Sequence, residues 1–138
     1  MTDRFERAYT GSPWEKEIGF CRALRAGPMV FTAGTAPVAD DGATFAPGDA
    51  ESQTARCYAL IERALEKLGA GRHCIVRCRM YVTDITRESE YGRAHRAFFR
   101  GHHPCLTMVE VSKLVRPDML VEVEAEAVVT DQVEFRAT

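Results

Sequence analysis

Apolar and polar side chains alternate with a period of two in several parts of the chain. This alternation is typical of strands that bury one face. It predicts strands over residues 19–25, 29–35, 73–83, 106–111 and 119–130. The first two are separated by Ala26, Gly27 and Pro28, which favour a tight turn.

Two other segments place apolar residues at helical spacing. Asp49 can cap the first of these helices, and Gly69 ends it. A second helix is expected over 89–100, ending at Gly101. The order strand, strand, helix, strand, helix, strand, strand predicts an α/β fold, an α+β sandwich with two helices on one face of a mixed β-sheet. Neither a repeat nor a linker divides the sequence, so a single domain over 1–138 is expected.

The alternation also sorts the charged residues onto one face of the predicted sheet. The apolar face of the third strand consists of Val76, Cys78, Met80 and Val82. The opposite face carries Arg77 and Arg79 on that strand and Glu122, Glu124 and Glu126 on the last one. Two interpretations stay open. This face could lie in solvent, or subunits could pack on it and enclose polar clefts in which opposite charges pair.

Composition narrows the possible partners. The chain has 138 residues, 46% of them hydrophobic, and a formal net charge of −2, which gives no general attraction for nucleic acid or anionic lipid. Its polar N-terminal segment and the absence of a long apolar run predict a cytoplasmic protein without a membrane span. The five cysteines form no CxxC pair, and the four histidines have no ligand spacing, so neither a metal nor a cofactor is expected.

Five segments resemble one known family in order and spacing. They are GPMVFTAGTAPV at 27–38, RCRMYVTDI at 77–85, AHRAFF at 94–99, HPCLTMVEVSKL at 103–114 and VEVEAEAVV at 121–129. Together they are similar to the RidA/YjgF reactive-intermediate deaminases. The resemblance implies a chorismate-mutase-like fold, a homotrimer with a small-molecule site in each inter-subunit cleft, and hydrolysis of enamines or imines such as 2-aminoacrylate.

The same resemblance exposes a departure from the family pattern. In the deaminases an arginine in the fourth strand holds the substrate carboxylate, and Leu106 stands at that position. Glu122 matches the glutamate that activates water, while Phe20 stands where a tyrosine is usual. Loss of a bidentate charged contact costs about 2–5 kcal/mol, so standard 2-aminoacrylate deamination is not expected. The segment SPWEK at 12–16 resembles a divergent branch of the family.

Arg79 is the first candidate for a replacement cation, because the alternation is expected to place it on the face of Leu106, Glu110 and Glu122. The alternative is a structural ion pair between Arg79 and Glu122 or Glu124. We interpret Glu122 and Arg79 as candidate catalytic residues.

Other candidates would line the cleft as ligand-binding residues. They are Trp14, Phe20, Cys105, Leu106, Thr107, Glu110 and Glu124. Three of them have a plainer structural interpretation: packing for Trp14 and Phe20, and packing in place of a reactive thiol for Cys105. Three functions stay open: hydrolysis of a C–N bond, metabolite binding or regulation without turnover, and, as a remote alternative, endoribonuclease activity.

Overall fold

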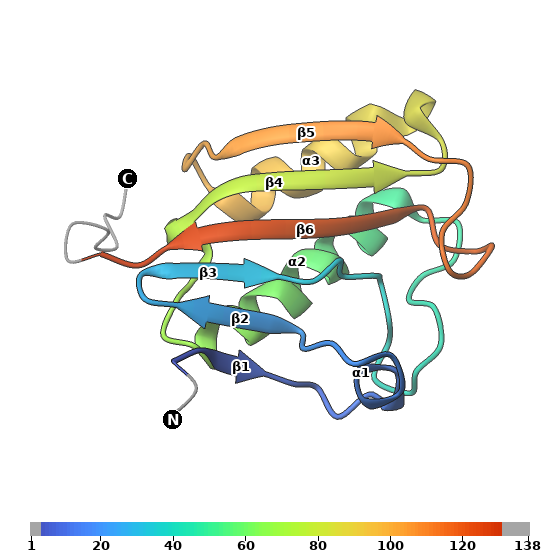
Figure 1. Ribbon diagram of the computed structural model, residues 1–138. Helices are drawn as coiled ribbons and strands as arrows, with labels where there is room; N and C mark the ends of the chain where they lie inside the picture. Colours follow the sequence, from blue (N-terminus) through green and yellow to red (C-terminus); the bar gives the residue numbers. More distant parts are fainter. Residues whose placement is uncertain (1–3, 131–138) are drawn as a thin grey trace.

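The computed structural model describes residues 4–130. The ends of the predicted domain, 1–3 and 131–138, lie outside the described residues. The chain forms a mixed six-stranded sheet with three α-helices (Figure 1). The strands are β1 (Glu6–Ala8), β2 (Ala23–Ala26), β3 (Met29–Thr32), β4 (Ile75–Val82), β5 (Cys105–Glu110) and β6 (Val121–Val128). The helices are α1 (Pro13–Ile18), α2 (Ala50–Glu66) and α3 (Glu88–Phe99), with 3-10 turns at Arg72–Cys74 and Ile85–Arg87.

The strand order is β1-β2-β3-β6-β4-β5. Neighbouring strands are antiparallel except for β4 and β5, which run parallel because α3 connects them as a crossover. The last strand of the chain therefore lies in the middle of the sheet, and β5 forms an edge. No helix within residues 4–130 is long and apolar enough to cross a membrane.

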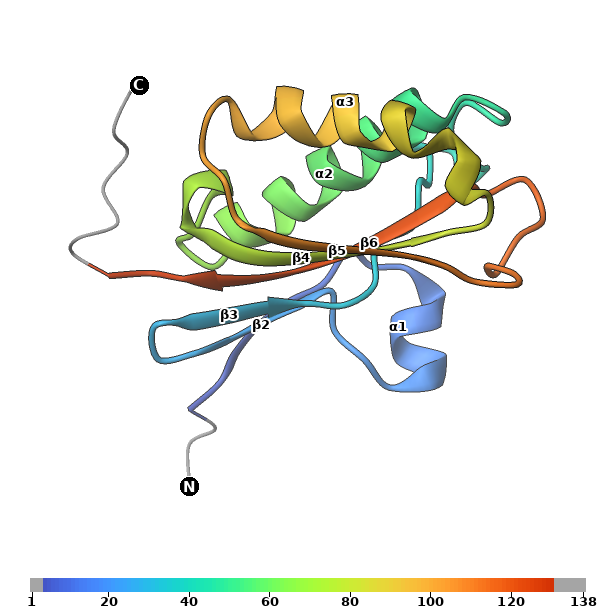
Figure 2. The same cartoon turned by 90° about the horizontal axis from the view of Figure 1, so that it is seen from above.

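Helices α2 and α3 cover one face of the sheet, as the sequence predicts, and α1 lies on the other side (Figure 2). Below, the open face means the face of β4, β5 and β6 opposite α2 and α3. The core lies between the two long helices and the sheet, and it includes fully buried Tyr58, Ile61, Met80 and Val123.

Local signals explain the position of α2. The Asp49 carboxylate accepts a hydrogen bond from the Ser52 backbone N–H (2.9 Å), which caps the helix as predicted. Inside the helix, the fully buried Gln53 donates to the Asp118 carbonyl (2.9 Å) and accepts from the Leu120 N–H (2.8 Å). These two bonds fix α2 against the segment that leads into β6, where Glu122 is found.

One predicted face is wrong at the start of β4. The pairing of β4 with β6 shifts register between Ile75 and Arg77. Ile75 is therefore buried in the core, and Val76 is 42% exposed instead of facing the helices. A β-bulge adds one residue to a strand and interrupts the period of two, so the alternation holds only from Arg77 onward.

Candidate functional site

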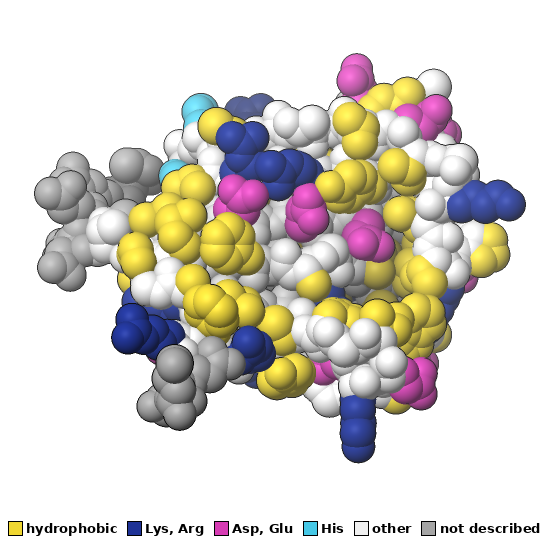
Figure 3. Space-filling model, viewed as in Figure 1, with side chains coloured by type: hydrophobic (Ala, Val, Ile, Leu, Met, Phe, Trp, Pro, Cys, Tyr) yellow, Lys and Arg dark blue, Asp and Glu magenta, His cyan; other side chains and the backbone are white. Residues whose placement is uncertain are grey.

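Four charged residues lie together on the open face. This charged row consists of Arg77, Arg79, Glu124 and Glu126. The register explains the grouping, because Arg77 pairs with Glu126 and Arg79 pairs with Glu124 across β4 and β6. Figure 3 shows basic and acidic side chains in contact on this face, with hydrophobic surface on either side of them.

Arg79 is held by carboxylates of the same chain. Its Nη1 atom lies 3.0 Å from Glu126 Oε1 and 3.5 Å from Glu124 Oε1. The hydrogen bond that Arg79 donates to Glu126 raises the pKa of Arg79 above its ordinary value. Tyr81 donates a hydrogen bond to Glu124 (2.7 Å), which raises the pKa of Tyr81. This geometry corresponds to the structural ion-pair interpretation, with Glu126 and Glu124 as partners.

The register of β5 corrects the predicted position of Arg79. Arg79 pairs with Thr107, and Cys78 pairs with Leu106. Because paired residues point to the same face, Leu106 and Glu110 project toward the helix side of the sheet, so the prediction that they share the face of Arg79 is wrong. Glu110 instead accepts a hydrogen bond from the Ile85 N–H (3.1 Å).

Glu122 occupies a different environment at the start of β6. Its side chain is partly buried, and burial raises the pKa of its carboxyl above the ordinary value; Arg22 opposes this rise and Glu124 adds to it. The carboxylate packs against the backbone of Gly34, where even a methyl group would collide with Glu122 Oε2. Gly34 is therefore required for the close approach.

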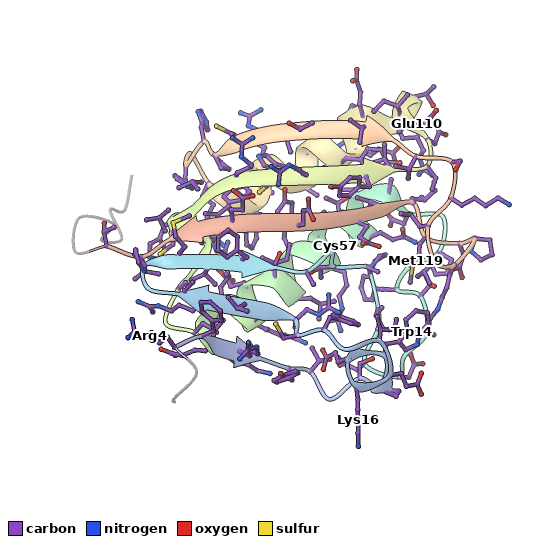
Figure 4. The ribbon with its side chains drawn as sticks, viewed as in Figure 1. Arg4, Trp14, Lys16, Cys57, Glu110 and Met119 are labelled. Carbon is purple, nitrogen blue, oxygen red and sulfur yellow. The ribbon has the colours of Figure 1, made fainter. Side chains whose placement is uncertain are left out.

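Glu122 is one of the residues that line a pocket of about 1290 Å³. We call it the α1–α2 pocket because both helices line it, together with the loop after β3. Its lining includes two residues predicted from the sequence, Trp14 and Phe20. Trp14 lies on α1 at the same end of the molecule as Met119, which also lines the pocket (Figure 4). A second hollow, of about 960 Å³, is lined by Phe20 but not by Glu122.

Helix α1, which the sequence analysis missed, is fixed by a buried carboxylate. Ser12 caps the helix by accepting from the Trp14 N–H (3.3 Å). Glu15 is only 4% exposed and accepts hydrogen bonds from the backbone N–H groups of Thr10 and Gly11. Burial raises the pKa of Glu15, but a hydrogen bond from the Thr10 hydroxyl (2.8 Å) and the two backbone hydrogen bonds outweigh it, and the net effect is a lowered pKa. The Ser-x-x-Glu pattern is a helix-start signal that could have predicted this turn.

Arg22 connects α1 to the floor of the pocket. Its Nη1 atom donates to the Gly34 carbonyl (2.6 Å), and its Nε atom lies 3.9 Å from Glu15 Oε2. Arg22 therefore holds in place the glycine against which Glu122 packs. Sequence reasoning did not single out Arg22 or Gly34, although Gly34 lies within the segment 27–38 that carries the family resemblance.

The predicted site residues thus fall into three places. Trp14, Phe20 and Glu122 meet in the α1–α2 pocket, whereas Arg79 and Glu124 belong to the charged row. The remaining four, Cys105, Leu106, Thr107 and Glu110, are exposed along the edge strand β5. One chain does not bring these three groups together. Within residues 4–130, no group of three or more His, Cys, Asp or Glu side chains could hold a metal ion.

Comparison with known proteins gives one consistent result. Residues 13–129 match the sequence pattern of the family described as Endoribonuclease L-PSP. An uncharacterized protein of Streptomyces coelicolor is 32% identical over 126 residues, covering 91% of this chain and 93% of that protein. A RutC family protein of Pyrococcus abyssi is 31% identical over 113 residues, covering 81% and 88%.

A solved structure agrees with these sequence matches. A Mycobacterium tuberculosis member of the YjgF/YER057c/UK114 family superposes with a TM-score of 0.82 at 40% identity. The match covers 91% of this chain and 99% of that one.

Proposed function

This chain belongs to the Rid/YjgF family and has its chorismate-mutase-like fold, and we propose that it hydrolyses an enamine, an imine or a related C–N bond of a small metabolite. The observation that carries the proposal is the partly buried Glu122 carboxyl in the α1–α2 pocket, with its raised pKa. A raised pKa brings a carboxyl closer to the working pH, where it can both accept and donate a proton.

The proposed chemistry needs only one such group. Glu122 accepts a proton from water as the water oxygen bonds to the imine carbon and the C=N π-bond electrons move to nitrogen. The proton then passes to that nitrogen to give a carbinolamine. Glu122 next takes the proton of the new hydroxyl group and transfers it to the amine nitrogen as the C–N bond breaks, which releases ammonia and a carbonyl product. An enamine enters the same path after protonation at carbon. Trp14 and Phe20 would form the wall that holds the substrate.

A second copy of the chain would complete the site. Leu106 and Glu122 of one chain lie on strands separated by β4, about 10 Å apart across the sheet, and they point to opposite faces. If Cys105, Leu106 and Thr107 contact the substrate, they come from a neighbouring subunit. The exposed apolar residues Phe31 (39%) and Val109 (42%) support the packing of copies in a homotrimer.

A non-catalytic homotrimer that binds a metabolite is the second candidate. Leu106 favours it, since an apolar residue stands where the deaminases hold the substrate carboxylate. Endoribonuclease activity is not proposed, because a net charge of −2 offers little general attraction for RNA.

Ammonia release from freshly generated imines distinguishes the two candidates. For the hydrolase we expect acceleration over buffer with at least one imine, and a slower reaction with 2-aminoacrylate than an arginine-bearing relative gives. For the binding protein we expect no acceleration with any imine but a higher Tm with a bound metabolite. Analytical ultracentrifugation of the same sample tests the trimer.

A further inference from the structure

Basic side chains outnumber acidic ones in the α1–α2 pocket. Five line it: Arg22, Arg56, Arg63, Lys67 and Arg116. Three acidic residues line it: Asp40, Glu66 and Glu122. With five basic side chains against three acidic ones, the pocket has a positive balance that would attract an anion.

Three of the basic residues come from one side of α2. Arg56, Arg63 and Lys67 are separated by seven and four positions, a spacing that aligns side chains along one stripe of a helix. Lys67 donates to the Tyr9 carbonyl (2.8 Å), and Arg56 donates from Nε to the Val38 carbonyl (2.8 Å). These backbone contacts fix the stripe without neutralising its charge.

The two arginines of this stripe converge on one carboxylate oxygen. Asp40 Oδ1 lies 2.9 Å from Arg56 Nη2 and 3.9 Å from Arg63 Nη1. Arg56 is 13% exposed, whereas Asp40 is 88% exposed. An ion pair with such an exposed partner contributes little to stability, so a ligand could replace Asp40 at low cost. Asp40 thus marks a place that accommodates a carboxylate between two guanidinium groups.

Another part of the pocket lining is apolar and could contact the apolar part of a ligand. Trp14 (50% exposed), Ile18 (65%) and Val115 (58%) all line it. Large apolar side chains left this exposed beside a cavity are typical of ligand sites.

We propose that the α1–α2 pocket binds a small organic anion, a carboxylate or a phosphate ester with an aromatic or branched apolar body, whose charged group displaces Asp40 from Arg56 and Arg63. This inference rests on the proposed function, since it names the class of substrate that would reach Glu122. It also supplies the cations that Leu106 cannot. Both arginines lie on α2, so the residues that bind the anion are not on the edge strand β5, where Leu106 stands.

Calorimetric titration with three probes tests the inference. Benzoate and phenyl phosphate carry the proposed groups, and benzyl alcohol is their uncharged counterpart. We expect at least one anion to bind at least tenfold more tightly than the alcohol; the tighter anion identifies the ligand group. Arg63→Gln should lower anion affinity about tenfold, as expected for loss of one charged contact. Asp40→Asn should raise anion affinity, because the competing carboxylate is removed.

Arg93→Gln is the matched control. Arg93 is 60% exposed and paired with Glu51, much as Arg63 is 59% exposed and paired with Asp40, but Arg93 does not line the pocket. Anion affinity should be unchanged in this variant. Equal binding of the alcohol, no binding of either anion, or an Arg63→Gln affinity equal to that of the wild type would overturn the inference.

Glu122→Gln separates this inference from the proposed function. The inference predicts that the variant still binds the anions, since the anion contacts Arg56 and Arg63. If hydrolysis fails with every imine while anion binding depends on Arg63, only the proposed function falls. If imines are hydrolysed but binding is independent of Arg63, only this inference falls.

Discussion

The same strand, β6, presents glutamates to two different environments. Glu126 lies in the charged row, bound to Arg79 in a pair exposed to solvent. Glu122, four residues earlier, lies in the α1–α2 pocket, where burial raises the pKa of its carboxyl. Pattern alone could not separate them, because both point to the same face. The difference shows that the surroundings of a carboxyl, here burial against Gly34 and the nearby Arg22, decide how its pKa is shifted.

Gly34→Ala should have the largest effect on the pocket. The added methyl collides with the Glu122 carboxylate, so either the strand or the side chain must move. Because the clash is with the end of a flexible side chain, we expect the Glu122 carboxylate to be displaced, with loss of turnover and only a small change in the free energy of unfolding measured by urea denaturation. Gly92→Ala on α3 is the control, because nothing lies within 4 Å of the added carbon and a helical alanine should stabilise slightly. Unchanged turnover in Gly34→Ala would show that Glu122 does not depend on the glycine.

Replacing Glu122 should have an intermediate effect, which is seen in the pH dependence of the free energy of unfolding. A carboxyl whose folded pKa is raised binds more protons in the folded state, so its contribution to stability is complete below the unfolded pKa. That contribution is lost as the pH rises from about 4.5 through the raised folded value. Glu122→Gln should therefore gain stability relative to the wild type as the pH rises above about 4.5, measured as the free energy of unfolding at a series of pH values. A constant difference in unfolding free energy over this range would contradict a raised pKa for Glu122.

Arg79→Gln should have the smallest effect on chemistry. Its guanidinium pairs with Glu126 and Glu124, outside the lining of the α1–α2 pocket. Turnover of the assembled protein should stay within about twofold, and loss of an ion pair at an exposed site should change the Tm only slightly. Kinetic assay and thermal unfolding of the same preparation measure both quantities. A large fall in turnover with unchanged stability would restore Arg79 as the replacement cation.

The sequence predicted the elements that bury one face. Alternation in β6 and the Asp49 cap of α2 are correct because burial and capping impose strong local patterns. The predicted face of Leu106 and Glu110 on β5 was wrong because an edge strand exposed on both faces carries little information about which way its side chains point. Helix α1 was missed because its six residues are too few for a periodic signal.

The candidate site was predictable only in part. The resemblance led to Glu122 and Phe20, which the structure places at one pocket. Arg56 and Arg63 lie on α2, and the sequence analysis considered only the apolar side of this helix. Their relation to Asp40 depends on a loop folding back onto α2, a contact that no local pattern encodes.

The central claim is that environment makes Glu122 the reacting carboxyl of β6. The most direct test compares ammonia release by Glu122→Gln and Glu126→Gln, identical substitutions on one face of one strand, using an imine that the wild type hydrolyses. We expect Glu122→Gln to lose a factor of about 10²–10⁴ in kcat, as is typical for general acid–base groups, and Glu126→Gln to stay near the wild-type rate. Equal losses in both variants, or full activity in Glu122→Gln, would contradict this account.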